Sequence, residues 1–285
     1  MNYTDKQFLK IAKDIIENGI SNSDDKGLRA KWEDGSIAST KAIFSTITRY
    51  DLSKGLPITT LRRQFWKGAI QELIWIWIKN SNNIKDLPLK IWDSWADDNG
   101  SIGKAYGYQL GKVIEFPEGR MTQVERLIYL LKNKPGDRRM VVTIWSNEDM
   151  KEMGLVPCAH TITFSVIGGK LNAVLDQRSG DFLAASGPGG YNEIQYATLV
   201  YMLAHIVNLE VGEFVHLTVN HHIYDRHIDY VKELVTIGEE IDTVSEQPKL
   251  IIKNKVEDFF DFTIEDFELV GYEPKSKSNK IEIAI

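Results

Sequence analysis

The sequence predicts an α+β protein in which residues 1–285 form one domain. Two long apolar stretches, 65–78 and 191–207, have the length and spacing of helices that pack into a core. Two others, 161–166 and 214–223, have the character of half-buried strands. Because 43% of the residues are hydrophobic and no linker-like segment interrupts the chain, one sizeable core can form.

The charge balance is mildly acidic, with 34 basic and 40 acidic side chains and no long block of either sign. This distribution argues against DNA or another groove-bound nucleic acid as a partner. No apolar run approaches the length of a membrane span, and the first residues lack the apolar core of a signal peptide. A lone cysteine fits a reducing compartment, so we expect a cytoplasmic protein without a membrane partner.

The first third of the chain supplies two helices, a loop and strands. Residues 8–19 have helical spacing and end at a glycine, 22–32 are polar and irregular, and 42–50 and 58–60 have strand character. The apolar stretch at 65–78 leaves almost no polar helical face. That helix is therefore expected to be buried on most sides.

Glu72 lies inside this apolar helix. Burying a lone carboxylate is costly, so the side chain must be paired, protonated or functional. From the pattern alone, a salt-bridged helix residue and a functional acid are equal alternatives.

A hairpin is predicted in the second half of the chain. An amphipathic helix at 123–133 precedes it, and the strand at 161–166 is followed by a turn at 167–170 that contains two glycines. The next strand, 171–175, therefore runs antiparallel to the first.

Cys158 is the only cysteine, so it cannot form a disulfide within the chain. A lone thiol is either inert packing or a nucleophile. Pro157 marks a turn before it, and the predicted hairpin returns Arg178 to the start of the strand that follows the cysteine. A neighbouring guanidinium favours the thiolate and can also grip a phosphate with two parallel hydrogen bonds. Thiol and guanidinium together suggest a nucleotide substrate.

Four histidines cluster near the end of the predicted strand at 214–223, namely His216, His221, His222 and His227. Such a cluster suggests zinc, but neighbouring residues of a strand point to opposite faces and no second thiol is present. We therefore predict no metal site.

The motifs around the cysteine resemble those of folate-dependent thymidylate synthase. The resemblance covers nearly the whole chain and rests on these motifs in order: Ile91-Trp92-Asp93-x-Trp95-Ala96, Gly103-x-x-Tyr106-Gly107, Asp137-Arg138-Arg139, Leu155-Val156-Pro157-Cys158, Gln177-Arg178-Ser179-x-Asp181, Asn192 before Tyr196-Ala197, Leu209-Glu210-Val211-Gly212-Glu213-Phe214 and His222-Ile223-Tyr224. It implies a large mixed or antiparallel sheet flanked by helices, with one sheet face forming a homodimer interface.

The resemblance also implies a reaction, the reductive methylation of dUMP to dTMP with 5,10-methylenetetrahydrofolate as one-carbon and hydride donor. Cys158 would add to C6 of the pyrimidine, and dihydrofolate would leave. Glu72 would organise a water network that handles protons, Tyr106 would help to remove the C5 proton, and Arg178 would serve both thiol and phosphate.

The remaining implied roles concern binding. The phosphate would be held by Arg29, Arg178, Ser179, and by Arg138 and Arg139 of the partner subunit. Asn192 would read the uracil edge, His222 and Tyr224 the sugar, and Asp181 would contact both dUMP and the pterin. Trp92 would lie beside the folate, and Ala284 belongs to a terminus that would close over both ligands.

Several positions depart from the common family pattern: Ala159 after the cysteine, Asn220 before the sugar-binding pair, Leu61 and Gln64 where basic residues serve the folate tail, and a rebuilt loop at 184–190. They leave a pyrimidine hydroxymethylase of the same fold as an alternative. A catalytically silent nucleotide-binding or RNA-binding relative is a second alternative, against which Cys158, Glu72 and Tyr106 argue.

Overall fold

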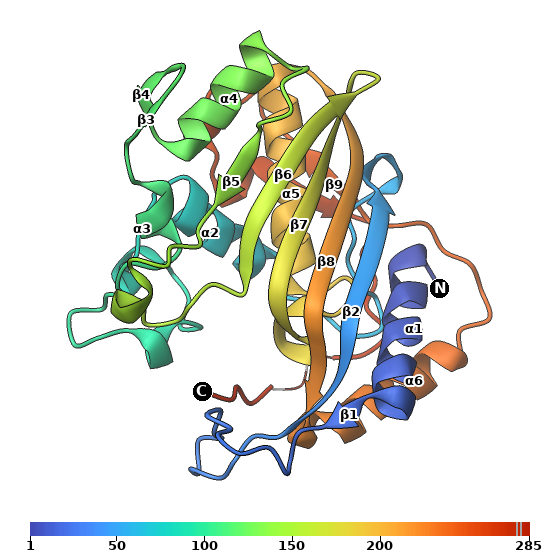
Figure 1. Cartoon of the computed structure of the whole chain (residues 1–285). Coiled ribbons are helices and arrows are strands. Elements are labelled where there is room, and N and C mark those ends of the chain that lie inside the picture. The colour runs from blue at the N-terminus through green and yellow to red at the C-terminus, as the bar shows by residue number, and fades with distance from the viewer. Residues whose placement is uncertain (278, 280) are drawn as a thin grey trace.

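The structure, a computed structural model, describes residues 1–277, 279 and 281–285. Its centre is a six-stranded sheet in the order β1-β2-β8-β7-β6-β5 (Figure 1). β7 and β8 pair in parallel and the other neighbours are antiparallel, so the sheet is mixed. The strands are β1 (Ile20–Ser21), β2 (Thr40–Asp51), β5 (Val141–Thr143), β6 (Ala159–Ile167), β7 (Lys170–Asp181) and β8 (Glu210–Tyr224).

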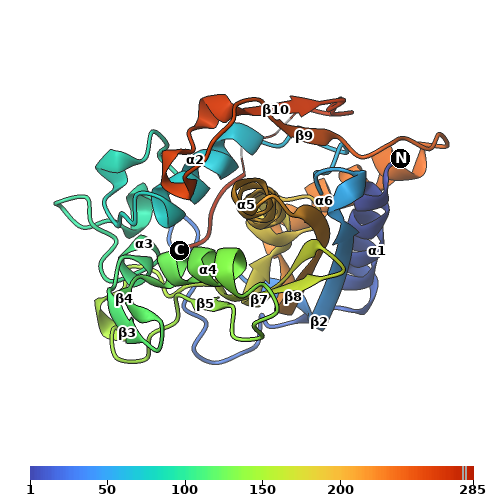
Figure 2. The same cartoon turned by 90° about the horizontal axis from the view of Figure 1, so that it is seen from above.

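Helices cover one face of this sheet. Helix α5 (Tyr191–Val207) crosses the face, and α2 (Trp66–Trp77) packs on α5 from outside (Figure 2). Because α5 is enclosed by the sheet on one side and by helices on the other, it is apolar all round. Helices α1 (Tyr3–Asn18) and α6 (Ile228–Glu239) pack together beside β2 and enclose a second, smaller core.

Shorter elements complete the chain. They are α3 (Gly107–Leu110), α4 (Gln123–Asn133), a hairpin of β3 (Ile114–Phe116) with β4 (Gly119–Met121), and a hairpin of β9 (Lys249–Ile252) with β10 (Phe267–Val270). Among the described residues, none of the helices combines the length and the apolar character that crossing a bilayer requires.

The predicted helices at 123–133 and 191–207 and the predicted hairpin are confirmed. The strand predicted at 58–60 is wrong, because this segment is irregular and buried. Its polar groups turn to the carboxylate of Asp5 in place of a strand partner: Thr59 Oγ1, Thr60 N and Thr60 Oγ1 donate to it over 2.7–2.8 Å. The N–H of Thr59 donates to the carbonyl of Gly189, and the carbonyl of Thr60 accepts from the N–H of Lys275. Asp5 and these two loop residues thus take the place of the ladder that the β-branched residues suggested.

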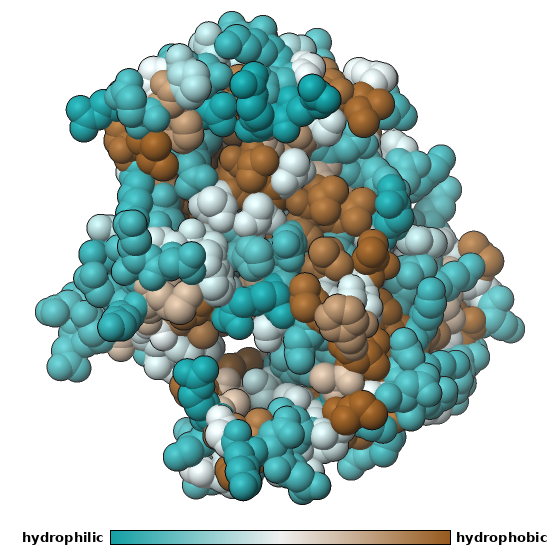
Figure 3. Space-filling view, in the orientation of Figure 1, coloured by the Kyte–Doolittle hydropathy of each residue, from teal (hydrophilic) through white to brown (hydrophobic). Residues whose placement is uncertain are grey.

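None of the described helices covers the opposite face of the sheet, and Figure 3 shows apolar side chains gathered over it. Phe44 is 87% exposed and Ile47 60% exposed on β2, and Val174 on β7 is also exposed. An apolar area of this kind on a regular element indicates an interaction surface.

Candidate active site

Cys158 lies where the chain enters β6, beside the end of β7. The backbone N–H of Arg178 donates to the carbonyl of Cys158 over 3.0 Å, and Nη2 of Arg178 lies 3.7 Å from the thiol sulfur. The guanidinium is held in place because it also donates to the carbonyls of Val156 (2.8 Å) and Pro157 (2.9 Å). The predicted approach of Arg178 to the thiol is confirmed.

Three effects act on the pKa of the thiol, and they do not all have the same sign. Burial raises the pKa of Cys158, the charge of Arg178 lowers it, and the charge of Asp181 raises it again. Burial is the largest of the three, so the guanidinium offsets the desolvation of a thiolate without reversing it.

Tyr106 and Glu72 lie on the α2 side of the thiol. The pKa of Tyr106 is raised far above its ordinary value, first by burial and then by the proximity of Cys158. Tyr106 also has φ 46° and ψ −107°, a backbone conformation that is costly for a residue with a side chain. Gly107 follows it, where a Cβ would come within 2.2 Å of the Ser81 carbonyl oxygen. Position 107 therefore requires a glycine directly after the turn at Tyr106.

Glu72 is buried, with 7% of its surface exposed. Burial raises its pKa to about 7, while polar groups of Gln195, Trp92 and Tyr191 lower it by less. Among the described residues no basic side chain acts on this carboxyl, and it titrates close to neutral pH. A pKa near 7 suits a group that must both give and take a proton.

Trp92 is buried beside Tyr106, with ring centroids 4.8 Å apart, and it also packs against Trp75 and Trp95. Through Tyr106, this aromatic group connects the helix that carries Glu72 to the thiol.

His222 and Tyr224 are separated by one residue on β8, and their ring centroids are 5.1 Å apart. Burial lowers the pKa of His222, and its Nδ1 lies 2.8 Å from Oδ1 of Asn220, which accepts the hydrogen bond. Asn220, which differs from the common family pattern, therefore still supplies an acceptor that orients the imidazole of His222.

Asp181 ends β7 and begins the π-helix at Phe182–Ser186. Its Oδ1 accepts from the N–H groups of Leu183 (3.0 Å) and Ala184 (3.1 Å). The rebuilt loop is thus anchored on Asp181. Ser186 in that loop lies 3.4 Å from Nδ2 of Asn192, which also donates to Gln177 over 2.9 Å.

The predicted phosphate arginines other than Arg178 lie on the surface. Arg29 is exposed between β1 and β2. Arg138 and Arg139 are exposed in the turn before β5, where Arg139 is paired with Asp137 (Nη2 to Oδ2, 2.9 Å). Ser179 follows Arg178 on β7, opposite Asn220 of β8.

The C-terminal residues are docked on the segment between β1 and β2. Ile285 exchanges two backbone hydrogen bonds with Lys31, over 2.7 and 2.8 Å. The carboxylate of Glu282 accepts from Arg226, whose guanidinium also reaches Asp34 over 2.6 Å. Ala284 lies next to Ile285 in this docked terminus, so the terminus and the Arg29 segment form one unit.

The three histidines of β8 have different side-chain partners. His221 contacts Thr46, whereas His222 contacts Asn220 and His216 contacts Gln177. Within residues 1–277, 279 and 281–285, no three histidine, cysteine or acidic side chains are grouped so that they could hold a metal ion.

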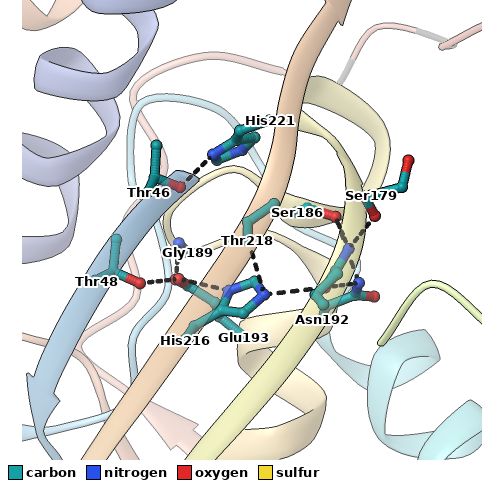
Figure 4. A network of polar contacts seen from close by, with 11 residues as sticks. Thr46, Thr48, Ser179, Ser186, Gly189, Asn192, Glu193, His216, Thr218 and His221 are labelled. Carbon is teal, nitrogen blue, oxygen red and sulfur yellow. Dashed lines mark hydrogen bonds and ion pairs between the residues drawn. The ribbon is translucent and has the colours of Figure 1, made fainter. Parts of the chain in front are cut away.

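Sequence reasoning assigned no site role to Gln177, Glu193 and His216, which are linked to Asn192 by a buried chain of hydrogen bonds. Figure 4 shows Asn192, Glu193 and His216 of this chain. A signal was present for Glu193, because it is an acid within an apolar helix, the same feature that singled out Glu72.

Comparison with known proteins identifies the relatives of this chain. The family model described as thymidylate synthase matches residues 6–285. Thymidylate synthase 1 of Bacillus subtilis is 40% identical over 282 residues, 97% of this chain and 98% of the relative. The thymidylate synthase of Bacillus phage phi3T is 39% identical with the same coverage. The solved structure of thermostable thymidylate synthase A from Bacillus subtilis superposes with a TM-score of 0.90, at 37% identity and over 100% of both chains.

Fold, motifs and relatives agree: the chain belongs to the thymidylate synthase family, whose members methylate dUMP to dTMP with 5,10-methylenetetrahydrofolate as co-substrate.

Proposed function

We propose that Cys158 is the nucleophile through which this enzyme activates dUMP, within one catalytic domain that spans residues 1–285. The observation that carries the proposal is the thiol 3.7 Å from a fixed guanidinium, with the phenol of Tyr106 near the thiol and the titratable acid Glu72 near that phenol. In the first step the thiolate forms a bond to C6, and the electron pair of the C5–C6 double bond moves toward C5 and O4. C5 thereby becomes the nucleophile that accepts the one-carbon unit.

Arg178 serves the phosphate of dUMP as well as the thiolate. Its Nε and Nη2 are used by Val156, Pro157 and the sulfur, and Nη1 makes none of the hydrogen bonds found among the described residues. Two N–H groups thus remain for a phosphate oxygen. Ser179 and Arg29 complete this side of the phosphate site.

Glu72 and Tyr106 handle the protons. Glu72, with its pKa near 7, supplies a proton toward O4 through water while charge develops there. Tyr106 remains a neutral phenol at neutral pH because its pKa is raised, so its oxygen accepts a hydrogen bond from the water that removes the C5 proton.

Asn192 reads the base, and β8 reads the sugar. The Asn192 amide donates to O4 and accepts from N3–H of uracil, whereas cytosine presents the opposite pattern at those atoms. His222 and Tyr224 bond to the sugar hydroxyl, and Asp181 contacts the nucleotide and the pterin.

The co-substrate supplies the one-carbon unit and the hydride. Trp92 and Asp181 lie on its side of the site, and the terminus with Ala284 excludes water from the reacting carbon. Kinship with enzymes named thymidylate synthase favours methyl over the hydroxymethyl product.

The enzyme acts as a cytoplasmic homodimer through the exposed face of the sheet. The apolar side chains of Phe44, Ile47 and Val174 would be buried against a second copy. Arg138 and Arg139, exposed on one chain, would then reach the phosphate site of the other.

The test is substitution of the thiol. In Cys158→Ser we expect turnover to fall by about a thousandfold or more, because a serine hydroxyl is a far weaker nucleophile at neutral pH. Binding of dUMP should persist, since the side chains are similar in size. Ser165→Ala, further along β6, is the matched control and should keep normal turnover.

Substantial turnover in Cys158→Ser would contradict the covalent scheme. The product is checked separately by absorbance and mass: methylation forms one dihydrofolate for each nucleotide, and a product heavier than dTMP by one oxygen would identify hydroxymethylation.

A further inference from the structure

Asn192 of α5 is the outer end of a buried polar chain that runs between α5 and the sheet and ends at Thr48 of β2 (Figure 4). Its Nδ2 donates to Oε1 of Gln177 over 2.9 Å. The same Oε1 lies 2.9 Å from Nε2 of His216, whose Nδ1 lies 3.2 Å from Oε1 of Glu193. Gln177, His216 and Glu193 are all buried. The hydrogen-bonding group that Gln177 presents to Asn192 is therefore set by buried residues.

The amide of Gln177 has only one possible orientation. Its Nε2 lies 2.8 Å from the backbone carbonyl oxygen of Ser179 and 2.5 Å from Oγ of Ser186. A carbonyl oxygen only accepts, so the amide nitrogen must face Ser179 and the amide oxygen must face His216 and Asn192. Oε1 then accepts from both.

The orientation of Gln177 fixes the proton on His216. Because Nε2 faces an acceptor at 2.9 Å, it must carry a hydrogen. On the other side of the ring, Nδ1 faces a carboxylate that already accepts from Thr48 Oγ1 (2.7 Å) and Gly189 N (2.6 Å). A second proton therefore lies between Nδ1 and Glu193, and it keeps Nε2 as a donor.

The surroundings of His216 add no competing charge. Phe214 stacks on its ring, with centroids 6.4 Å apart, and Thr218 Oγ1 lies 3.2 Å from Nε2. Of the neighbouring titratable groups, burial and then Glu193 raise the pKa of Tyr50, and burial and then His216 lower that of His221, so both remain neutral.

We infer that the Glu193–His216 pair is a positioning device for base recognition: it holds Gln177 as an acceptor, and Gln177 in turn holds the Asn192 amide with Oδ1 free for N3–H of uracil. The inference rests on the proposed role of Asn192. If the pair did not hold it, the amide could turn over and present the pattern that suits cytosine.

Two substitutions of one residue separate this role from a merely structural one. In shape, an asparagine amide nitrogen replaces Nδ1 of a histidine, and a glutamine amide nitrogen replaces Nε2. His216→Asn thus keeps the donor to Glu193 and loses the donor to Gln177, whereas His216→Gln does the reverse. Binding of dUMP and dCMP to each variant is measured by calorimetry.

We expect the preference for dUMP over dCMP to fall about tenfold or more in His216→Asn and to be largely retained in His216→Gln. Thr46→Val is the matched control, because it removes a 2.7 Å hydrogen bond to a buried histidine of the same strand, His221, that does not reach Gln177. Its preference should be unchanged. Equal losses in both His216 variants would overturn the inference.

Nitrogen NMR of the native protein tests the proton arrangement without any variant. Nε2 of His216 should carry a proton, and a ring protonated only at Nδ1 would overturn the inference. Asn192→Asp separates the two proposals. If Asn192→Asp leaves the preference for dUMP over dCMP intact, the proposed base recognition by Asn192 is wrong. If Asn192→Asp changes this preference and His216→Asn does not, only the inferred positioning role of the Glu193–His216 pair is wrong.

Discussion

Glu72 on α2 and Glu193 on α5 are two buried acids in the same core that have been given different surroundings. Glu72 has neutral polar neighbours whose effect is smaller than that of burial, so its pKa rises to about 7. Glu193 has a hydroxyl, a backbone N–H and an imidazole directed at its two oxygens. A buried acid that lacks strong donors exchanges protons near neutral pH, whereas one with three donors serves as a fixed acceptor.

The largest effect should come from removing the proton that Glu72 exchanges. In Glu72→Gln we expect kcat to fall by about a hundred- to ten-thousandfold, because the amide cannot transfer a proton. Steady-state rates of dihydrofolate formation measure this. A variant that retained most of its activity would show that Glu72 fills space only.

The same variant should be more stable than the native protein above neutral pH. The folded pKa of Glu72, near 7, is above its ordinary value of 4.5. Its contribution to stability is therefore present below pH 4.5 and is lost as the pH rises to 7, about 3 kcal/mol at 1.36 kcal/mol per pKa unit. Glu72→Gln should abolish this slope in denaturant titrations between pH 5 and 8. If the free energy of unfolding of the variant keeps the same pH dependence, a group other than Glu72 has the raised pKa.

The matched change in the other acid should have the opposite sign. Glu193→Gln removes the negative charge that faces His216 and replaces one carboxylate oxygen by an amide nitrogen, which cannot accept the hydrogen bond that Thr48 Oγ1 or Gly189 N donates to that oxygen. We expect it to lower the free energy of unfolding by about 2 kcal/mol, the cost of one buried unsatisfied group. Denaturant titration at pH 8 compares the change in the free energy of unfolding with that of Glu72→Gln. If both variants change it in the same direction, the two acids do not differ in the way described.

The smallest effect should come from trimming one donor of Glu193. Thr48→Val keeps the volume of the side chain and removes the 2.7 Å hydrogen bond, so we expect a loss of about 1 kcal/mol. Thr46→Val, two residues away on β2, serves as the control that does not touch Glu193. If both variants lose the same stability, the hydroxyl of Thr48 is no more than an ordinary strand contact.

The sequence by itself determined the local elements and one long-range contact. Apolar periodicity located the helices at 123–133 and 191–207, and the glycine turn predicted the hairpin that returns Arg178 toward Cys158. These features depend on residues near each other in the chain or on a single hairpin. A register shift between Ala159 and Thr161, which the sequence did not reveal, sets Arg178 directly opposite Cys158. Family motifs added the remaining site residues, whose individual roles stay predictions.

Only the tertiary structure decided how distant polar groups are satisfied. Asp5 of α1 takes the donors of Thr59 and Thr60, which turned a predicted strand into an irregular segment. The parallel pairing of β7 with β8 places His216 between Glu193 and Gln177, and the surroundings of Glu72 raise its pKa. A buried polar group takes its partner from whatever the fold brings near, so its state depends on strand order and packing that no local pattern encodes.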